Sequence, residues 1–393
     1  MNLPIYLDTA STTFPYKDCL QPFQEENYYY NASNLYNPAL ELKFKIEQTR
    51  KHMLELLGIE DGTILFTSGG CEGNNTVIKN VILYGESDPY IQEKFNKENK
   101  VLPHVITSEI EHHSVLNPLK QMERLKLCEV TYIKPQKDGH ISPQKIMEAI
   151  KQNTILISIM SVNNELGTIN DIHKIGEIAK NFKIYFHTDC TQSLGKFNIH
   201  KNTFNFIDFM TFSAHKFHGP KGVGGLYIKN INTFQAFIAG GNQEFELRAG
   251  TYNYPAIKGM EIALDKSLNY PHNVHNIIKQ ILISELQNRF GQNIRINSPL
   301  DSIIPILNFS LKNCDGEAIS MQLAEHQIYT SNGSACNTGS LEPSYVLKSI
   351  DCPEDYIYGT IRISWDFRTT YEQIYFFIDK LTEIYKNYEV KNE

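Results

Sequence analysis

The sequence has few features of a nucleic-acid-binding or membrane protein. Its 393 residues carry a formal net charge of −7 and contain no long block of Lys and Arg, so the basic surface typical of a protein that binds DNA or RNA directly is missing. No stretch approaches the roughly 18 apolar residues that a membrane-spanning helix needs. The first residues lack a basic segment followed by an apolar one, and we therefore expect a cytoplasmic protein without a membrane anchor.

Cysteine is sparse and scattered along the chain. There are seven cysteines, and no two of them have the spacing C-x-x-C. An odd, dispersed set fits reduced thiols better than a disulfide framework or a zinc site, and it leaves one thiol as a candidate nucleophile. His215 and His218 are spaced like some metal ligands, but no third ligand lies at a diagnostic distance in the sequence. We therefore predict no metal site.

The middle of the chain alternates short apolar runs with amphipathic stretches, which is typical of an α/β fold with a parallel sheet between helices. Ser142 and Asp171 are predicted N-caps of helices over Pro143–Lys151 and Ile172–Asn181. The seven predicted strands are Thr63–Thr67, His104–Thr107, Val130–Ile133, Ile155–Met160, Ile184–His187, Phe206–Thr211 and Gly225–Ile228.

The length of the chain predicts two domains, because it is about two to three times that of a typical domain. A helical pattern dominates from Pro255 until a candidate strand at Ile306–Leu311. We therefore predict a large domain over residues 15–255. A smaller α+β domain is predicted over residues 256–393, completed by the N-terminal segment 1–14. No low-complexity linker separates the two, so we expect them to pack closely.

Polar residues directly after apolar runs are the first candidates for a site, because ligands in open α/β sheets bind beyond the carboxyl ends of the strands. The stretch Thr67–Asn74 (TSGGCEGN) runs from a predicted strand through glycines into a predicted helix. Backbone N–H groups in such a stretch, together with the helix N-terminus, can hold a phosphate. Taken alone, the segment is more often a tight turn without a ligand.

Asp189 comes two residues after another predicted strand, and Gln192 follows three residues later. An acid in this place can hold a proton on a heteroaromatic nitrogen, so that the ring withdraws electrons from a substrate carbon. Gln192 is then a candidate partner of an oxygen on the ring. An Asp that only caps the next helix is the commoner arrangement.

Lys216 follows a third predicted strand, within Ser213-Ala214-His215-Lys216. A lysine in an enclosed site loses its proton more easily than one in water and can form a Schiff base with an aldehyde. Ser213 and His215 are candidates for binding a phosphate beside it. A lone lysine is more often solvated at the surface, so this segment does not decide the matter alone.

Cys336 lies in a small, polar stretch, Ser331–Gly339 (SNGSACNTG). Structural cysteines usually lie in apolar elements, so this setting predicts an accessible thiol on a mobile loop. An inert surface cysteine is the alternative.

Together these segments resemble the cysteine desulfurases of the class V aminotransferase-like family, in the group with the longer Gly-Ser-Ala-Cys catalytic loop. The matching segments are Ile5–Asp8, Phe66–Gly69, Glu111–His112, Val162–Gly167, Asp189–Gln192, Ser213–Lys216, Arg248–Thr251, Gly333–Cys336, Ser340–Ser344 and Ile361–Arg362. The resemblance is specific because these segments occur in order along nearly the whole chain. It implies the pyridoxal-phosphate (PLP) fold type I, with a mainly parallel seven-stranded sheet in a large PLP-binding domain.

The resemblance also implies how the cofactor is held. Lys216 would be the Schiff-base lysine, His112 would stack on the ring and move protons, and Asp189 would partner the pyridine nitrogen. His113 is expected to be a surface histidine. The ring hydroxyl region and the phosphate would be held by Asn164, Gln192, the backbone amides of Gly70 and Cys71, Ser213, His215 and, across a homodimer interface, Thr251.

By the same resemblance, Arg362 would clamp the carboxylate of L-cysteine, with Asn31 and Asn164 in the substrate pocket. A base, either Lys216 or His112, removes the α-proton. The Cys336 thiolate then takes the sulfur as a persulfide and L-alanine is released. The sulfur would pass to an acceptor protein for iron–sulfur cluster assembly or for tRNA thiolation.

Four departures from the usual family pattern fall near these motifs. Cys71 stands where Thr is common and Ala214 where Gly is common, and we expect cofactor binding to tolerate both. Phe245-Glu246 replaces a common Arg-Gly, and Asp366-Phe367 replaces a common Gly-Arg. The last two remove or displace basic residues, which puts the family's ion pairs and acceptor docking in question.

Two kinds of rival function stay open at this point. The first is another reaction on the same fold, such as that of a selenocysteine lyase or an aminotransferase, although transamination has no need of a thiol at Cys336. The second is a catalytically inert binding partner. The presence of Lys216, Asp189, Gln192 and His112 in one chain argues against that role.

Overall fold

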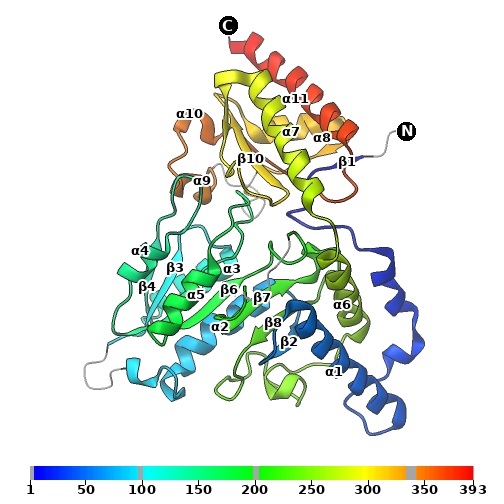
Figure 1. Cartoon of the computed structure of the whole chain (residues 1–393), viewed down its shortest axis with the longest axis vertical. Coiled ribbons are helices and arrows are strands. Elements are labelled where there is room, and N and C mark those ends of the chain that lie inside the picture. Colours follow the sequence, from blue (N-terminus) through cyan, green and yellow to red (C-terminus); the bar gives the residue numbers. More distant parts are fainter. Residues whose placement is uncertain (1–3, 96–100, 198–202, 333–341, 393) are drawn as a thin grey trace.

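The computed structural model describes residues 4–95, 101–197, 203–332 and 342–392. These residues form a large lobe and a smaller one, and both chain ends lie at the smaller lobe (Figure 1). The large lobe is built on a seven-stranded sheet and the smaller lobe on a three-stranded sheet.

The sheet of the large lobe contains all seven predicted strands. In spatial order they are β2 (Thr63–Thr67), β8 (Gly224–Ile228), β7 (Phe209–Ser213), β6 (Tyr185–Asp189), β5 (Thr154–Ser158), β3 (His104–Ser108) and β4 (Glu129–Ile133). Strands β7 to β4 run parallel, and β8 is antiparallel to both of its neighbours. The predicted mainly parallel sheet is therefore confirmed. The predicted and observed bounds differ most at β7, which begins at Phe209 instead of Phe206. Phe206 lies in a turn in which the Ile207 N–H donates to the Phe204 carbonyl at 3.2 Å.

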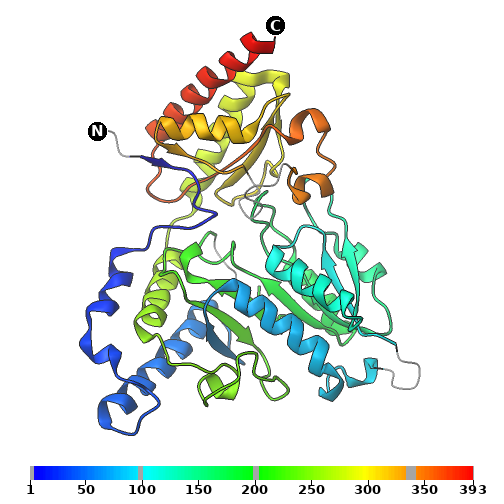
Figure 2. The ribbon, with the colours of Figure 1, turned by 180° about the vertical axis from the view of Figure 1, so that it is seen from behind.

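Helices cover both faces of this sheet. Successive side chains of each strand point to opposite faces, and both faces are apolar. In β2, Ile64 and Phe66 belong to one apolar core and Leu65 to another. The face with Leu65 is covered by α2 (Gly70–Tyr84) and α3 (His113–Arg124), seen in front in Figure 2. The other face is covered by α1 (Asn37–Leu57), α4 (Pro143–Glu148), α5 (Ile172–Asn181) and α6 (Tyr254–Leu268).

Two of these helices begin at the predicted N-caps. Ser142 accepts a hydrogen bond from the Lys145 N–H, and Asp171 accepts one from the Lys174 N–H at 3.0 Å. Helix α5 has the predicted bounds, whereas α4 ends at Glu148 instead of Lys151.

The small lobe has its own apolar core, formed by residues that include Leu7, Leu282, Phe309, Trp365 and Phe377. Its antiparallel sheet has the order β12 (Thr360–Ser364), β10 (Ile306–Leu311) and β9 (Ile294–Ile296). Its other elements are α7 (Asn273–Phe290), α8 (Gly316–Glu325), α9 (Tyr345–Ser349), α10 (Glu354–Ile357), α11 (Tyr371–Asn392) and the parallel pair β1 (Ile5–Tyr6) and β11 (Ile328–Tyr329). In the described part of the chain, no helix combines the length and the apolar character needed to cross a membrane.

The domain division stays a prediction, and the packing of two segments bears on it. Leu7 lies in the core of the small lobe, as expected for the segment 1–14. Helix α6 instead contributes Ile257 and Met260 to the core of the large lobe. This packing favours a division after Leu268 over one at residue 255.

A buried ion pair supports an unusual turn in the large lobe. Glu244, Phe245 and Glu246 have φ values of 47°, 59° and 67°, a left-handed conformation that costs roughly 1–2 kcal/mol for each such residue. The Glu244 carboxylate accepts hydrogen bonds from two Arg50 nitrogens at 2.8 and 2.9 Å and from the Phe66 N–H at 2.7 Å. The ring of Phe245, one of the departures from the family pattern, lies 5.0 Å from the Arg50 guanidinium.

Replacing Arg50 with Met should lower the free energy of unfolding by about 3–5 kcal/mol, because it leaves the buried Glu244 carboxylate without its cation. The shift of the urea unfolding transition measures this effect. Lys51→Met is the matched control, because Lys51 is the next residue of α1 and its side chain is 80 % exposed. The control should change stability by less than about 0.5 kcal/mol. Equal effects of the two substitutions would contradict a structural role for the ion pair.

Candidate active site

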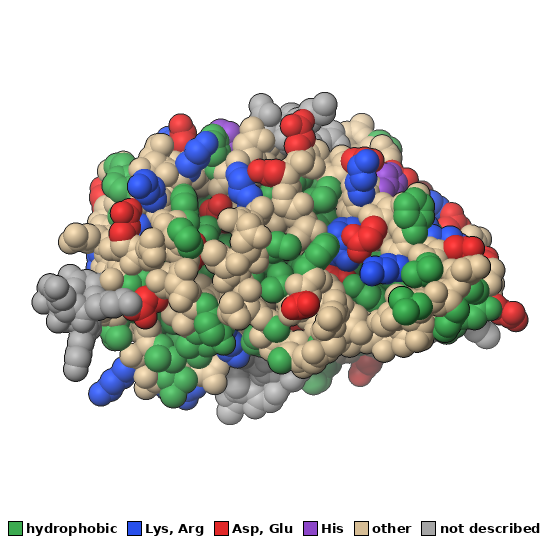
Figure 3. All heavy atoms as spheres, turned by 90° about the horizontal axis from the view of Figure 1, so that it is seen from below, with side chains coloured by type: hydrophobic (Ala, Val, Ile, Leu, Met, Phe, Trp, Pro, Cys, Tyr) green, Lys and Arg blue, Asp and Glu red, His purple; other side chains and the backbone are tan. Residues whose placement is uncertain are grey.

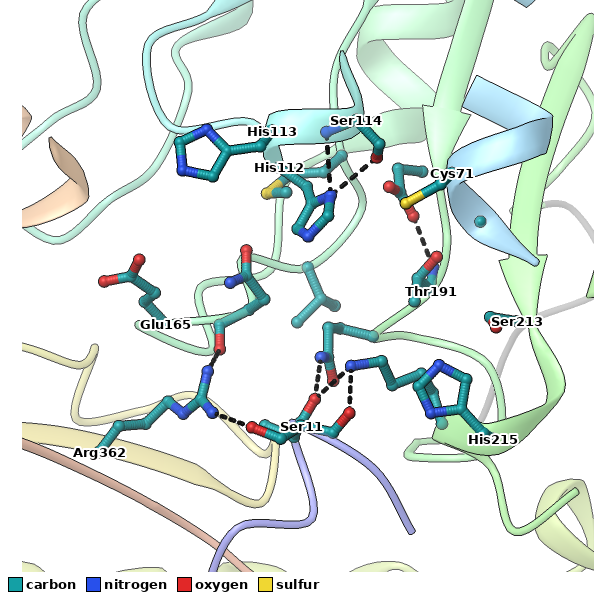
Figure 4. Close-up of a pocket in the computed structure, with 18 of the residues that line it drawn as sticks. Ser11, Cys71, His112, His113, Ser114, Glu165, Thr191, Ser213, His215 and Arg362 are labelled. Atoms are coloured by element: carbon teal, nitrogen blue, oxygen red, sulfur yellow. Dashed lines mark hydrogen bonds between the residues drawn. The ribbon is translucent and has the colours of Figure 1, made fainter. Parts of the chain in front are cut away.

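A cavity of about 310 Å³ lies where the ends of β5, β6 and β7 meet the N-terminal segment and the small lobe. Its volume is within the range of small-molecule and cofactor sites. Ten of the predicted site residues line it: Gly70, Cys71, His112, Asn164, Asp189, Gln192, Ser213, His215, Lys216 and Arg362. Figure 4 shows Cys71, Thr191, Ser213 and His215 on one side of the cavity, with Glu165 and Arg362 on the other.

Asp189 is the buried acid at the carboxyl end of β6. Its carboxylate accepts a hydrogen bond from Asn74 Nδ2 at 2.7 Å and another from the Thr191 N–H at 2.9 Å. A carboxylate has further acceptor sites beyond these two. Asp189 is therefore equipped to accept a hydrogen bond from a protonated ring nitrogen in the cavity.

Lys216 is held by the N-terminal segment. Its Nζ donates to the carbonyl oxygens of Ala10 and Ser11 at 2.7 and 2.8 Å. The Ala10 carbonyl also accepts a hydrogen bond from Gln192 Nε2 at 2.8 Å. A carbonyl can only accept, so this contact fixes the Gln192 amide with its nitrogen toward Ala10 and its oxygen toward Lys196, whose Nζ donates to it.

The start of α2 forms a narrow cradle. A Cβ atom at Gly70 would lie 3.0 Å from Thr191 Oγ1, and one at Gly73 would lie 2.6 Å from Thr211 Cγ2. Only glycine leaves this space open, and the N-terminus of the 15-residue helix adds partial positive charge. Thr191 Oγ1 is buried and has no hydrogen-bond partner among the described residues. The cradle therefore suits an anion with several acceptor oxygens.

His215 lies beside this cradle and is neutral at physiological pH. Its Nδ1 is 3.0 Å from Thr12 Oγ1. Burial, together with the charges of Lys216, Lys221 and Lys196, lowers the pKa of His215 to about 4. A neutral ring can still donate one hydrogen bond to an anion.

Arg362, on β12, brings the small lobe to the cavity. Its guanidinium donates to the Asn164 carbonyl at 3.0 Å, to the Asp8 carboxylate at 2.9 Å and to Ser11 Oγ at 2.8 Å. Arg362 Nε and Asn164 Oδ1 are buried and have no partner in the described part of the chain. Because unsatisfied buried polar atoms are costly, a polar ligand at this end would be favoured.

His112 is the N-cap of α3 and is mostly buried. Burial lowers the pKa of His112, whereas the charge of Asp189 acts in the opposite direction. His113 was expected at the surface, and that expectation is wrong. It lines the cavity with its ring 4.8 Å from the ring of Tyr345, because the first turn of α3 lies at the cavity wall.

Three predicted residues are not found in the cavity. Thr251 and Asn31 are exposed and do not line it within this chain. Asn31 Oδ1 instead accepts a hydrogen bond from the Ser33 N–H at 3.0 Å. Cys336 lies outside the described residues. The roles of all three stay predictions.

Two buried carboxyl groups near the cavity were missed by the sequence analysis. Glu165 accepts a hydrogen bond from Ser344 Oγ at 2.6 Å, and burial raises its pKa to about 7. Glu111 accepts from Ser108 Oγ at 2.6 Å, and burial raises its pKa to about 8. Both lie inside motifs that were noticed for other residues, so their positions were visible but their burial was not.

The departure at Asp366-Phe367 has a local explanation. Asp366 is buried and pairs with Arg368 two residues later, and its carboxylate lies 4.0 Å from His218 Nδ1. Arg368, which lies one place later than the basic residue of the common family pattern, therefore neutralises Asp366.

Glu165→Gln should flatten the pH dependence of stability. The folded pKa of about 7 exceeds the ordinary value near 4.3, so the folded state binds the proton more tightly and wild-type stability falls as pH rises between these two values. Urea unfolding at pH 5 and pH 8 should show this fall reduced by about 1–3 kcal/mol in the variant. An identical fall in both proteins would show that Glu165 ionises normally.

Comparisons with known proteins agree with this geometry. The class V aminotransferase family model matches residues 5–377. The curated cysteine desulfurase IscS of Dictyoglomus turgidum is 36 % identical over 391 residues, covering 98 % of this chain and 95 % of the relative. The cysteine desulfurase IscS of Methanosarcina thermophila is 36 % identical over 389 residues, covering 98 % of this chain and 91 % of that protein.

Solved structures show the same similarity. A NifS-like protein superposes with a TM-score of 0.85 at 29 % identity, covering 98 % of this chain and all of its own. SspA in complex with cysteine superposes with a TM-score of 0.77 at 32 % identity, covering 92 % of this chain and 98 % of that one. The predicted PLP fold type I architecture is confirmed. The chain belongs to the class V aminotransferase family and, within it, to the cysteine desulfurases.

Proposed function

We propose that this protein uses PLP to remove sulfur from L-cysteine, releases L-alanine and carries the sulfur as a persulfide on Cys336. The observation that carries the proposal is the convergence of Lys216, Asp189, His112 and Arg362 on one cavity. These residues come from distant parts of the chain, and each suits a different part of one cofactor–substrate pair.

The residues of the cavity fit PLP. The cradle at Gly70, with Ser213, neutral His215 and the unpartnered Thr191 hydroxyl, suits a phosphate. Asp189 would accept from the ring nitrogen, and the Gln192 amide, fixed by Ala10, would donate to the ring oxygen. Lys216 would attach the cofactor through Nζ.

Each residue then has one task. When bound, PLP supplies a ring that withdraws electrons from the substrate α-carbon, and Asp189 keeps a proton on the ring nitrogen. Lys216 Nζ would take the α-proton of the substrate. The His112 ring, which lines the same cavity, would cover the face of the cofactor.

Arg362 would hold the substrate carboxylate. Its guanidinium is already oriented by Asn164, Asp8 and Ser11, so little conformational entropy is lost when a carboxylate binds. Asn164 Oδ1, which has no partner among the described residues, would contact the substrate or the cofactor ring. Asn31 stays a proposed contributor to the substrate pocket.

A homodimer would explain the exposed position of Thr251, which would reach the cofactor phosphate of the partner subunit. Figure 3 shows apolar side chains in several groups on the underside of the large lobe. The segment at the start of α1 is strongly apolar at its surface, with Leu35 88 %, Tyr29 64 % and Phe44 63 % exposed. Such exposed groups are typical of a protein interface.

The sulfur acceptor would be an iron–sulfur scaffold or a tRNA-thiolation enzyme in the cytoplasm. Relatives named IscS support the general route of sulfur transfer. No feature of the described residues selects between the two acceptors.

Treatment with cysteine should add one sulfur atom to Cys336. Peptide mass spectrometry of the treated protein checks this expectation. Cys71 is the rival site, because its exposed thiol lines the same cavity. The Cys71→Ser variant should still gain sulfur on Cys336. The Cys336→Ser variant should gain no sulfur and release no alanine, but it should keep the absorption of the bound cofactor. Sulfur found on Cys71 alone would overturn the assignment.

Arg362→Lys should raise the KM for cysteine by about 10- to 100-fold, because a lysine cannot replace the planar, two-nitrogen contact with a carboxylate. Cofactor absorption should not change, since Arg362 contacts none of the predicted phosphate or ring-nitrogen partners. Steady-state alanine release measures KM. Loss of cofactor absorption in this variant would place Arg362 at the cofactor instead of the substrate.

A further inference from the structure

A chain of hydrogen bonds joins the acid at the end of β6 to the histidine at the start of α3. Asn74, on α2, donates from Nδ2 to Asp189 Oδ2 at 2.7 Å and to Ser114 Oγ at 2.8 Å. Ser114 Oγ lies 2.7 Å from His112 Nδ1, and the Ser114 N–H donates to the same nitrogen at 3.1 Å. Asn74 is fully buried and Ser114 is 8 % exposed, so water does not compete for these contacts.

The chemistry of the groups fixes the direction of every bond in this chain. The Asp189 carboxylate only accepts, so the Asn74 amide must turn its nitrogen toward it. The second N–H of that nitrogen then goes to Ser114 Oγ, which leaves the Ser114 hydroxyl proton for His112 Nδ1. The backbone N–H of Ser114 can only donate. His112 Nδ1 must therefore be an unprotonated acceptor.

We propose that Asn74 and Ser114 are positioning residues that hold His112 as the neutral tautomer with its proton on Nε2. Figure 4 shows both contacts of Ser114 with one ring nitrogen of His112, while the ring itself faces the cavity. Neither Asn74 nor Ser114 was predicted from the sequence to have a role.

The charges around His112 act on this state in both directions. Asp189 favours a positive ring, whereas Lys216 and the neighbouring His113 disfavour it. Burial has the largest effect and lowers the pKa of His112. Glu111, the preceding residue, has its carboxyl group bonded to Ser108 and to the Met160 N–H. Protonation of Nδ1 would in addition break the two hydrogen bonds that this nitrogen accepts from Ser114. The network and the burial therefore both favour the neutral ring.

This state has a consequence for catalysis that rests on the proposed function. A ring with its proton on Nε2 donates a hydrogen bond into the cavity and cannot accept a proton at that atom. Of the two candidate bases for the α-proton, this leaves Lys216. Asp189 would thereby act twice, directly on the ring nitrogen of the cofactor and, through Asn74 and Ser114, on the histidine above it.

Nitrogen NMR of the protein labelled with ¹⁵N-histidine tests the proposal on the purified enzyme. The His112 signals are identified by their loss in His112→Gln among the 13 histidines of the chain. We expect Nδ1 to show the shift of an unprotonated nitrogen and Nε2 that of a protonated one at neutral pH. A protonated Nδ1 would overturn the proposal.

Titration of variants tests the positioning role. Ser114→Ala removes one of the two donors to Nδ1, so the pKa of His112 should rise by about half to one unit. Asn74→Ala should shift it in the same direction, because Ser114 is then free to turn. Ser114→Thr keeps the hydroxyl and should restore the wild-type value. Asn75→Ala is the matched control, since Asn75 is the partly buried next residue of α2 and its side-chain amide donates to the Cys71 carbonyl instead of to the His112 network.

The outcomes are separable from those for the proposed function. If wild type and Ser114→Ala titrate alike, Ser114 does not position the histidine and the inference fails. If the expected shifts appear in a protein that releases no alanine from cysteine, the inference stands and the proposed function fails. In an active enzyme, the acid limb of the pH profile of kcat/KM should move upward in Ser114→Ala by the same half to one unit.

Discussion

The buried carboxylate of Asp189 is the constraint on which the rest of the site depends. It lies at the end of β6, between the parallel neighbours β5 and β7, and a charge in such a place must be fully hydrogen-bonded to be tolerated. The Thr191 N–H and Asn74 supply two of the bonds, and a protonated ring would supply another. Through Asn74 the same charge reaches Ser114 and orients His112.

The N-terminal segment completes the site from the opposite side. Carbonyl oxygens of Ala10 and Ser11 hold Lys216, and Ala10 also fixes the amide of Gln192. Asp8 and Ser11 hold Arg362 of the small lobe. A segment that pairs with the small lobe through β1 thus also carries the contacts of Lys216. The positions of the two lobes are in this way linked to the geometry of the cavity.

Much of this arrangement could be predicted from the sequence, because it follows from local rules. The seven strands were found from their apolar runs, and Asp189 and Lys216 from their positions directly after two of them. What escaped prediction depends on contacts between distant residues. Glu165 and Glu111 are ordinary acids until burial raises their pKa values, and Asn74 has no evident role until α2 brings it to β6.

The same distinction explains the remaining differences. His113 was expected at the surface because its neighbours do not reveal which side of α3 faces the cavity. Helix α6 follows the predicted domain boundary in sequence but packs on α1 and the large sheet, because its apolar face matches that core. Local pattern identifies an element, and only tertiary packing decides which lobe it joins.

The most direct test of the account is the identity of the residue that binds the cofactor. The protein is incubated with PLP, reduced with borohydride and digested, and the peptide that carries the cofactor is identified by mass spectrometry. The account predicts the cofactor on Lys216. Lys196 is the informative alternative, because it is buried beside Gln192 and its pKa is lowered well below the ordinary value by burial. Cofactor on Lys196, or on no lysine, would contradict the account.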